Sequence, residues 1–120
     1  MSKPLVLIVE DDPAQNQIFS ITLKSDFEVE TFTDGDSAVT RLEEVAPALL
    51  VLDLHLPGVS GSDILTRVRK DRRMAETRVI LTTADERQAD FLYDQVDMIL
   101  LKPVSPGQLK DLALRLCPVR

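Results

Sequence analysis

Apolar runs of strand length alternate with amphipathic stretches along the whole chain, and this alternation predicts five strand–helix units. The first run, "LVLIV" from Leu5 to Val9, is apolar at every position, whereas a half-exposed strand would alternate. We therefore expect this strand to be covered on both faces. The other predicted strands span residues 28–32, 49–52, 79–81 and 98–101.

The stretches between the strands carry apolar residues at helical spacing. The first predicted helix starts at Pro13, runs to about residue 25, and has its apolar positions at Ala14, Ile18, Ile21 and Leu23. Three further helices are predicted over residues 37–45, 62–72 and 106–116. Between the last two strands, a helix is predicted to carry one stripe formed by Ala89, Leu92 and Val96.

Strands that alternate with helices predict an α/β fold in which a parallel sheet has helices on both faces. Right-handed crossovers reduce the topologies to a doubly wound sheet. For five such units we expect the flavodoxin-like (βα)5 fold, with a five-stranded parallel sheet in the order 2-1-3-4-5. The 120 residues suit one compact domain, 1–120, and leave little room for a second.

The net charge of −6 argues against nucleic acid or an anionic membrane as the main partner, because both favour basic surfaces. One basic stretch, "TRVRKDRR" at residues 66–73, is more typical of a solvated helix end than of a docking patch. The single cysteine, Cys117, excludes an internal disulfide and suits a packed thiol on the last helix. With no long apolar run and no signal-like start, we expect a cytoplasmic protein.

Polar side chains collect where the predicted strands end. In doubly wound sheets, ligands bind at the carboxyl ends of the strands, near the point where the strand order reverses. The first strand is followed by three acids, the third by one acid, the fourth by two threonines and the fifth by a lysine. In chain order these residues are Glu10, Asp11, Asp12, Asp53, Thr82, Thr83 and Lys102. Because the first and third strands are expected neighbours, at least three carboxylates should crowd one crevice.

Several carboxylates at one site raise each other's pKa or attract a cation. An oxygen-only site matches Mg²⁺ better than a transition metal, and His55, the only histidine, lacks a second soft ligand that would favour zinc. A divalent ion, a lysine and a hydroxyl form a recurring arrangement around a phosphoryl group. A carboxylate can attack phosphorus to give an aspartyl phosphate, and Asp53 is best placed for that attack.

Each of these residues also has a purely structural interpretation. Asp12 is more typical of an N-cap ahead of Pro13 than of a metal ligand. Lys102 alone would be a surface lysine, and a lone Thr82 or Thr83 would be a β-branched strand residue. The chemical interpretation rests on the coincidence that acids, a hydroxyl and a lysine fall at successive strand ends.

Four segments resemble the receiver domain of two-component response regulators. "LIVEDDP" is similar to the family's first-strand acidic motif, and "LVLDLHLPGVSG" to its phosphoacceptor motif. "VILTTADE" is similar to its hydroxyl motif, and "LLKPVSP" to its Lys-Pro motif. The four occur in the family's order and spacing, so the resemblance covers essentially the whole chain.

The resemblance implies a role for each matching acid. Asp53 would accept the phosphoryl group. Glu10, Asp11, Asp53 and the backbone carbonyl of His55 would hold Mg²⁺ or Mn²⁺. Asp11 would be the more direct ligand, with Glu10 acting through water.

Two other residues match groups that contact the phosphoryl group in the family. Thr83 matches the hydroxyl because it precedes a small residue, Ala84, and Thr82 should point away because strand side chains alternate. Lys102 matches the lysine. Pro103 after it matches a frequently cis peptide bond, which would aim the lysine inward.

The chain departs from the family pattern near its last strand. The switch Tyr or Phe three residues before the lysine is Ile99 here, and the usual Gly-Ala-Asp reads Gln-Val-Asp at residues 95–97. Either Ile99 moves as an aliphatic substitute, or the face around the last strand signals differently. His55 and Asp85 flank the phosphoryl site in the family and are expected to tune the lifetime of the phosphoryl group.

By resemblance, the chain is a signalling switch rather than a metabolic enzyme. A sensor histidine kinase or histidine phosphotransfer protein would donate the phosphoryl group, and the domain would catalyse its transfer to Asp53 and its later hydrolysis. The last two helices would then reach an output domain or a second copy. The chain would be a stand-alone regulator, a relay intermediate or a receiver excised from a longer protein, and its ending "LCPVR" favours the last.

Two other functions compete with this interpretation. A receiver-like protein-binding module that works without phosphorylation is favoured by Ile99 and disfavoured by the complete site. A phosphatase with an aspartyl nucleophile would need a second acid two residues later, where this chain has His55.

Overall fold

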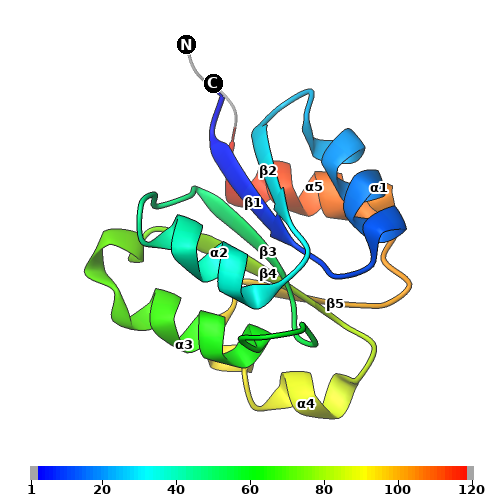
Figure 1. The fold of residues 1–120 in the computed structure, drawn as a ribbon. Helices are drawn as coiled ribbons and strands as arrows, with labels where there is room; N and C mark the ends of the chain where they lie inside the picture. The colour runs from blue at the N-terminus through cyan, green and yellow to red at the C-terminus, as the bar shows by residue number, and fades with distance from the viewer. Residues whose placement is uncertain (1–2, 119–120) are drawn as a thin grey trace.

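Five parallel strands form one sheet within residues 3–118, the part of the chain that the computed structural model describes. They lie in the order β2-β1-β3-β4-β5, so the expected flavodoxin-like topology is confirmed (Figure 1). The strands are β1 (Leu5–Val9), β2 (Glu28–Phe32), β3 (Leu49–Asp53), β4 (Arg78–Thr83) and β5 (Met98–Leu101).

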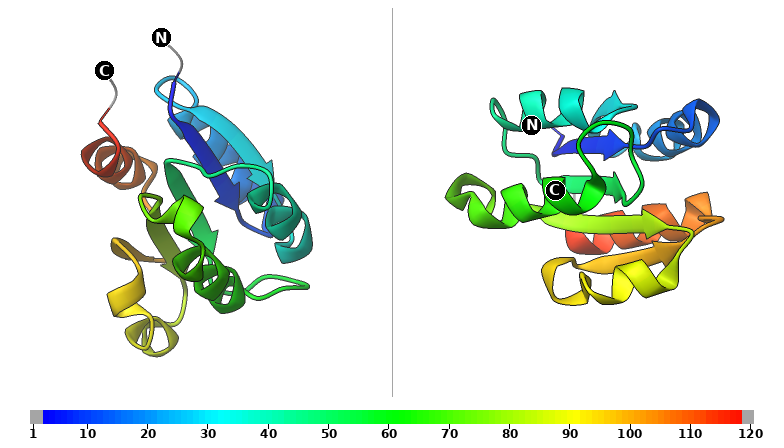
Figure 2. Two further views of the ribbon diagram at one scale, coloured as in Figure 1. Left: turned by 90° about the vertical axis from the view of Figure 1, so that its left-hand side faces the viewer. Right: turned by 60° about the horizontal axis from the view of Figure 1, so that its bottom comes forward.

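Helices cover both faces of the sheet (Figure 2). Two of them, α1 and α5, pack side by side on one face, and α2, α3 and α4 lie on the other. The helices are α1 (Pro13–Leu23), α2 (Gly35–Leu42), α3 (Gly61–Lys70), α4 (Glu86–Asp90) and α5 (Pro106–Leu116). Short 3-10 turns follow α3 and α4, namely η1 (Arg72–Met74) and η2 (Tyr93–Gln95).

Strand β1 is buried on both sides, as its unbroken apolar run predicts. Leu7 and Val9 belong to the core under α2, α3 and α4, and Val6 and Ile8 belong to the core under α1 and α5. All four are at most 1% exposed. The alternation assigns each strand residue to one of these two faces, and it extends to the polar residues at the strand ends.

Helix α1 buries a different face from the one that its aliphatic residues suggest. Its buried residues are Asn16, Phe19 and Leu23, whereas Ile18 and Ile21 are 45% and 56% exposed. The buried set follows the i, i+3, i+7 spacing of one helix face. Because Asn16 on this face is polar, the apolar residues of α1 alone do not reveal its buried face.

Helix α4 is shorter than predicted. It ends at Asp90, η2 follows, and Phe91 in between is 88% exposed. At the last residue of η2, Arg69 Nε of α3 donates to the Gln95 carbonyl at 2.7 Å, which fixes the backbone just before β5. The prediction of one helix over Ala89, Leu92 and Val96 is therefore wrong, although all three residues pack against the core under α2, α3 and α4.

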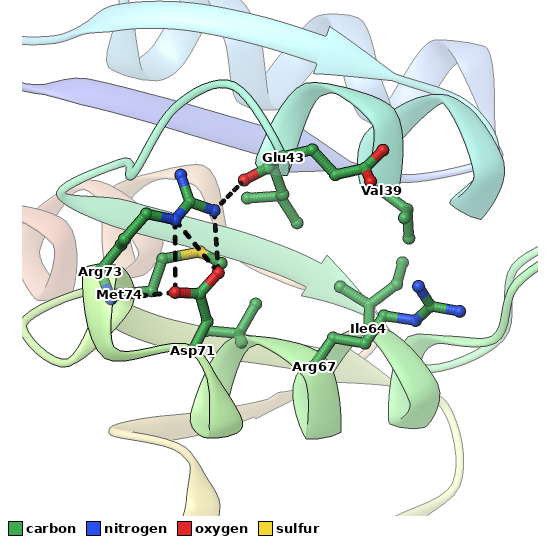
Figure 3. A pocket seen from close by; sticks show the side chains of 9 residues that line it. Val39, Glu43, Ile64, Arg67, Asp71, Arg73 and Met74 are labelled. Carbon is green, nitrogen blue, oxygen red and sulfur yellow. Dashed lines mark hydrogen bonds and ion pairs between the residues drawn. The ribbon is translucent and has the colours of Figure 1, made fainter.

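The basic stretch "TRVRKDRR" is partly built into the fold. Arg69 also donates to the Thr77 carbonyl at 2.9 Å. Arg73 donates to the Leu42 carbonyl at 2.8 Å and pairs with Asp71, beside a groove between α2 and α3 (Figure 3). The expectation of a solvated helix end is thus wrong for Arg69 and incomplete for Arg73.

The end of α5 matches the expectation for the lone cysteine. Cys117 is buried, its Sγ lies 3.4 Å from the Ala48 carbonyl oxygen, and burial raises the pKa of its thiol. Among residues 3–118, no helix combines the length and the apolar character that crossing a bilayer requires.

Candidate functional site

The acidic residues after β1 and β3 meet at one edge of the sheet. The two strands are paired in register up to Val9 and Leu52, so the next residues, Glu10 and Asp53, lie side by side. Glu10 and Asp53 are 1% and 2% exposed, and Asp11 is exposed to solvent. One carboxylate oxygen from each of these three acids lies within 4.8 Å of the other two. The predicted clustering of the three acids is confirmed.

Lys102, which directly follows the edge strand β5, contacts two of these acids. Its Nζ lies 2.8 Å from Glu10 Oε1 and 2.9 Å from Asp53 Oδ2. The Lys102–Pro103 peptide bond is cis, as the resemblance implies. One ammonium group therefore bridges two buried carboxylates that belong to neighbouring strands.

Burial dominates the electrostatics of the cluster. It raises the pKa of Glu10 to about 7, an effect to which the hydrogen bond with Asp53 adds and which the bond from Lys102 only partly opposes. Burial alone would lower the pKa of Lys102, but hydrogen bonds to Glu10 and Asp53 outweigh it and raise that pKa. The ammonium is thus held charged beside an acid that exchanges its proton near neutral pH.

The raised pKa of Glu10 makes stability depend on pH. In the unfolded chain the pKa of this carboxyl is 4.5, so between that pH and about 7 the folded protein binds more protons than the unfolded one. Stability therefore falls as pH rises through this window, by about 1.4 kcal/mol per unit of pKa difference and at most about 3 kcal/mol in all. We expect Glu10→Gln to be more stable than the wild-type protein at about pH 8 and similar to it at about pH 4.

Urea unfolding in metal-free buffer over this pH range measures the difference. Glu28→Gln, which removes an exposed carboxylate from β2, is the matched control and should keep the wild-type profile. Parallel profiles for the wild-type protein and Glu10→Gln would contradict the raised pKa.

The third acid of the first-strand segment serves the next helix. Asp12 Oδ1 accepts a hydrogen bond from Ala14 N at 3.0 Å, and Pro13 occupies the first turn of α1. The N-cap interpretation of Asp12 is confirmed. In turn, Asp12 N donates to Glu10 Oε2 at 3.2 Å, which leaves Glu10 Oε1 for Lys102.

Two neighbours hold the nucleophile candidate Asp53 in place. The backbone N–H of His55 donates to Asp53 Oδ1 at 3.0 Å, and the His55 side chain is exposed. Gly61, the first residue of α3, packs so tightly that a Cβ there would lie 2.2 Å from the Asp53 carbonyl oxygen. Only glycine permits this approach of α3 to the end of β3. The resemblance did not single out Gly61, although its place after a loop and before a helix is a usable signal.

Asn16 is a second residue that sequence reasoning missed. Its Nδ2 donates to the carbonyl oxygens of Glu10 and Phe32, each at 3.0 Å, and the side chain is 5% exposed. This side chain of α1 therefore ties together the ends of β1 and β2. A buried amide on an otherwise apolar helix face is the signal that could have identified it.

The two threonines after β4 lie on opposite faces of the sheet. Thr83 follows the face of Leu81, under α2, α3 and α4, and its Oγ1 accepts a hydrogen bond from Asp85 N at 3.0 Å. Thr82 follows the face of Ile80 and is paired in register with Asp53. The side chains of Thr82 and Thr83 thus alternate as expected, and register puts Thr82 on the same sheet face as Asp53.

The remaining candidates lie around Thr83. Asp85 is the N-cap of α4 and accepts from Arg87 N at 3.0 Å. Ile99, at the position where the family has its switch aromatic, is half-buried and packs against the core under α2, α3 and α4. The hydroxyl candidate Thr83 and the switch position Ile99 thus share one sheet face.

Sequence comparison agrees with this geometry. The family model described as the response regulator receiver domain matches residues 6–114. The chain belongs to the response regulator receiver domain family. The acids and the lysine that the structure brings together lie in three of the four segments that resemble the family's motifs.

Two similar proteins are longer than the segment that this receiver domain matches. It is 34% identical over 110 residues to the phosphate regulon transcriptional regulatory protein PhoB of Rhizobium meliloti, covering 88% of this chain and 48% of PhoB. It is 32% identical over 111 residues to the sensor histidine kinase TmoS of Ectopseudomonas mendocina, covering 90% of this chain and 11% of TmoS. The chain therefore spans about half or less of the length of these relatives.

Solved structures show the same fold. The response regulator DrrB, an OmpR/PhoB homolog of Thermotoga maritima, superposes with a TM-score of 0.84 at 29% identity, covering 96% of this chain and 52% of DrrB. The BeF3-activated receiver domain of DrrB superposes with a TM-score of 0.86 at 28% identity, covering 95% of this chain and 97% of that domain.

Proposed function

We propose that this receiver domain is a phosphorylation-dependent switch in which Asp53 accepts a phosphoryl group from a sensor histidine kinase or a histidine phosphotransfer protein in the cytoplasm. The observation that carries the proposal is the placement of Asp53, whose buried carboxylate clusters with Glu10 and Asp11 and contacts the Lys102 ammonium. A regulator such as PhoB and a kinase such as TmoS, both similar to this chain, are the kinds of protein in which it would act.

The donor set fits a divalent cation. Glu10, Asp11 and Asp53 offer only oxygen ligands, and the His55 backbone carbonyl would add another, which suits Mg²⁺ or Mn²⁺. When bound, the ion would supply positive charge that neutralises the phosphoryl oxygens. The solvent exposure of Asp11 and the burial of Glu10 agree with a more direct role for Asp11.

In the proposed transfer, an Asp53 carboxylate oxygen attacks the phosphorus of a phosphohistidine. The new O–P bond forms as the P–N bond breaks, and the histidine leaves with the electron pair on nitrogen. The His55 backbone N–H orients the attacking carboxylate. Lys102, already 2.9 Å from Asp53 Oδ2, would neutralise charge on the transferred group.

The output of the switch would begin at Thr83. Its hydroxyl is engaged by Asp85, the residue that caps α4, and it would have to leave this partner to bind a phosphoryl oxygen. Phosphorylation would thus loosen the start of α4, beside the half-buried Ile99. His55 and Asp85 flank the same edge and would set how fast water removes the phosphoryl group.

Beryllofluoride, which mimics a phosphoryl group on a carboxylate, tests this function. With Mg²⁺ present, we expect it to shift the amide NMR signals of residues around Asp53 and of α4 and β5. Chelation of Mg²⁺ should abolish these shifts, and Asp53→Ala should show none of them. An unchanged wild-type spectrum, or the same shifts in Asp53→Ala, would instead favour a binding module that works without phosphorylation.

A further inference from the structure

Thr82 carries a buried hydroxyl that the proposed chemistry does not use. The residue is 1% exposed, and its Oγ1 has no hydrogen-bond partner among residues 3–118. Buried hydroxyl groups normally make a hydrogen bond, because a hydroxyl without one has lost its contacts with water and gained no partner in the protein. The other buried threonines differ, since Thr77 Oγ1 donates to the Pro47 carbonyl at 2.7 Å and Thr83 is bonded to Asp85.

The strand order puts this hydroxyl beside the path of Lys102. Strand β4 lies between β3 and β5, and Thr82 is paired in register with Asp53 on one side and Leu100 on the other. The backbone of Lys102 directly follows β5, and its N–H donates to the Thr83 carbonyl at 2.8 Å. Its Nζ reaches Asp53 on β3 and Glu10 beyond β1, so the side chain must cross the end of β4.

Alternation of side chains puts Thr82 on the face that Lys102 crosses. The residues two positions earlier on each strand, Ile8, Val51, Ile80 and Leu100, all belong to the core under α1 and α5. Asp53 and Thr82 continue two of these rows within their strands, and Lys102, the first residue after β5, reaches Asp53 with its Nζ. A single buried hydroxyl thus lies between the carboxylate that would be phosphorylated and the strand that supplies the ammonium.

An ammonium group has three N–H donors, and a hydroxyl oxygen can accept from one of them. In the unphosphorylated protein two carboxylates hold Lys102 Nζ. Once Asp53 is an acyl phosphate, its negative charge lies on the phosphoryl oxygens, and the ammonium must shift to follow it. An acceptor on β4 would then fix the direction in which the ammonium points.

We propose that Thr82 is a positioning residue for Lys102, accepting a hydrogen bond from its ammonium when a phosphoryl group is attached to Asp53. This inference rests on the proposed phosphorylation of Asp53. It gives the chain a second functional threonine, on the sheet face opposite to Thr83. Thr82 would act through Lys102 and would not itself contact the phosphorus.

Thr82→Val removes the hydroxyl and keeps the β-branched shape, so it separates positioning from packing. We expect Asp53 to be phosphorylated by phosphoramidate and Mg²⁺ roughly 5- to 10-fold more slowly in Thr82→Val, as the ammonium is less well placed. The melting temperature should be unchanged or higher, because an unpartnered polar atom is gone. Thr82→Ser should recover a rate within about twofold of the wild type, and Thr82→Ala should be as slow as Thr82→Val.

Exchange of the Lys102 ammonium protons with water tests the proposed contact directly, because it should not change if Thr82 served packing alone. In the beryllofluoride-bound protein, the Lys102 ammonium protons should be protected from exchange with water in the wild type and in Thr82→Ser, and should lose this protection in Thr82→Val. Thr31→Val, on the exposed side of edge strand β2, is the matched control and should match the wild type in both measurements.

Three results would overturn the inference. A Thr82→Val rate within about twofold of the wild type would show that the hydroxyl has no role. A slower rate with unchanged protection of the Lys102 ammonium would show that Thr82 acts elsewhere. If the wild-type protein is not phosphorylated at all, the proposed function fails and the inference fails with it, whereas the first two results leave that function intact.

Discussion

Replacing Asp53 by asparagine is expected to abolish phosphorylation of this receiver domain. The amide cannot supply the anionic oxygen that attacks phosphorus, and it also removes a ligand from the acid cluster. We expect incorporation of phosphoryl from phosphoramidate to fall by on the order of 100-fold or more. Intact-mass measurement of the phosphorylated fraction over time, with Mg²⁺ present, gives the rates directly.

Asp12→Asn is the matched control for this experiment. Asp12 lies at the same edge of the sheet as Asp53, but it caps α1. Asparagine caps helices as well as aspartate does. The control should therefore keep the wild-type rate and stability. Phosphorylation of Asp53→Asn at the wild-type rate would show that another residue is the acceptor.

The second large effect is expected for Lys102→Met, and it appears in stability. Lys102 is the cation that both buried carboxylates contact, so its loss leaves Glu10 and Asp53 without compensation. Removing one partner from a buried ion pair typically destabilises a protein by about 3 kcal/mol or more. We expect a loss of this size at about pH 8 in metal-free buffer, measured by urea unfolding.

The loss should shrink toward acid pH. Glu10, whose pKa burial raises to about 7, takes up a proton as pH falls, so fewer buried charges lack a partner in Lys102→Met at acid pH. Lys110→Met is the matched control, because Lys110 is 43% exposed and lies 3.5 Å from Asp26 at the surface. Equal stability of the wild type and Lys102→Met at about pH 8 would show that the contacts of Lys102 are energetically neutral.

Much of the fold and of the acid cluster could be predicted because both depend on order along the chain. The unbroken apolar run of β1 indicated a central strand, and the strand order then brought Glu10 next to Asp53. The polar groups at this edge of the sheet could be predicted for the same reason, because they belong to the residues that directly follow each strand.

The features that could not be predicted depend on contacts between distant segments. The backbone before β5 is held by a hydrogen bond from Arg69 to the Gln95 carbonyl, between residues 26 positions apart. The sheet face of Thr82 depends on register with Asp53, which the alternation of a single strand cannot supply. Asn16 was overlooked because its amide occupies an otherwise apolar face and bonds to two strand ends.

The reach of Lys102 across the sheet has a consequence for how the chain folds. The lysine comes from the last strand, 49 residues after Asp53, so β1 and β3 can pair well before their counter-ion is in place. Until β5 docks, the edge of that partial sheet carries two carboxylates with no cation to bury against. The stabilisation that Lys102 gives to these two carboxylates is therefore gained only when the final strand docks. A fragment that lacks β5 leaves both carboxylates without this counter-ion and should be less stable than the whole domain.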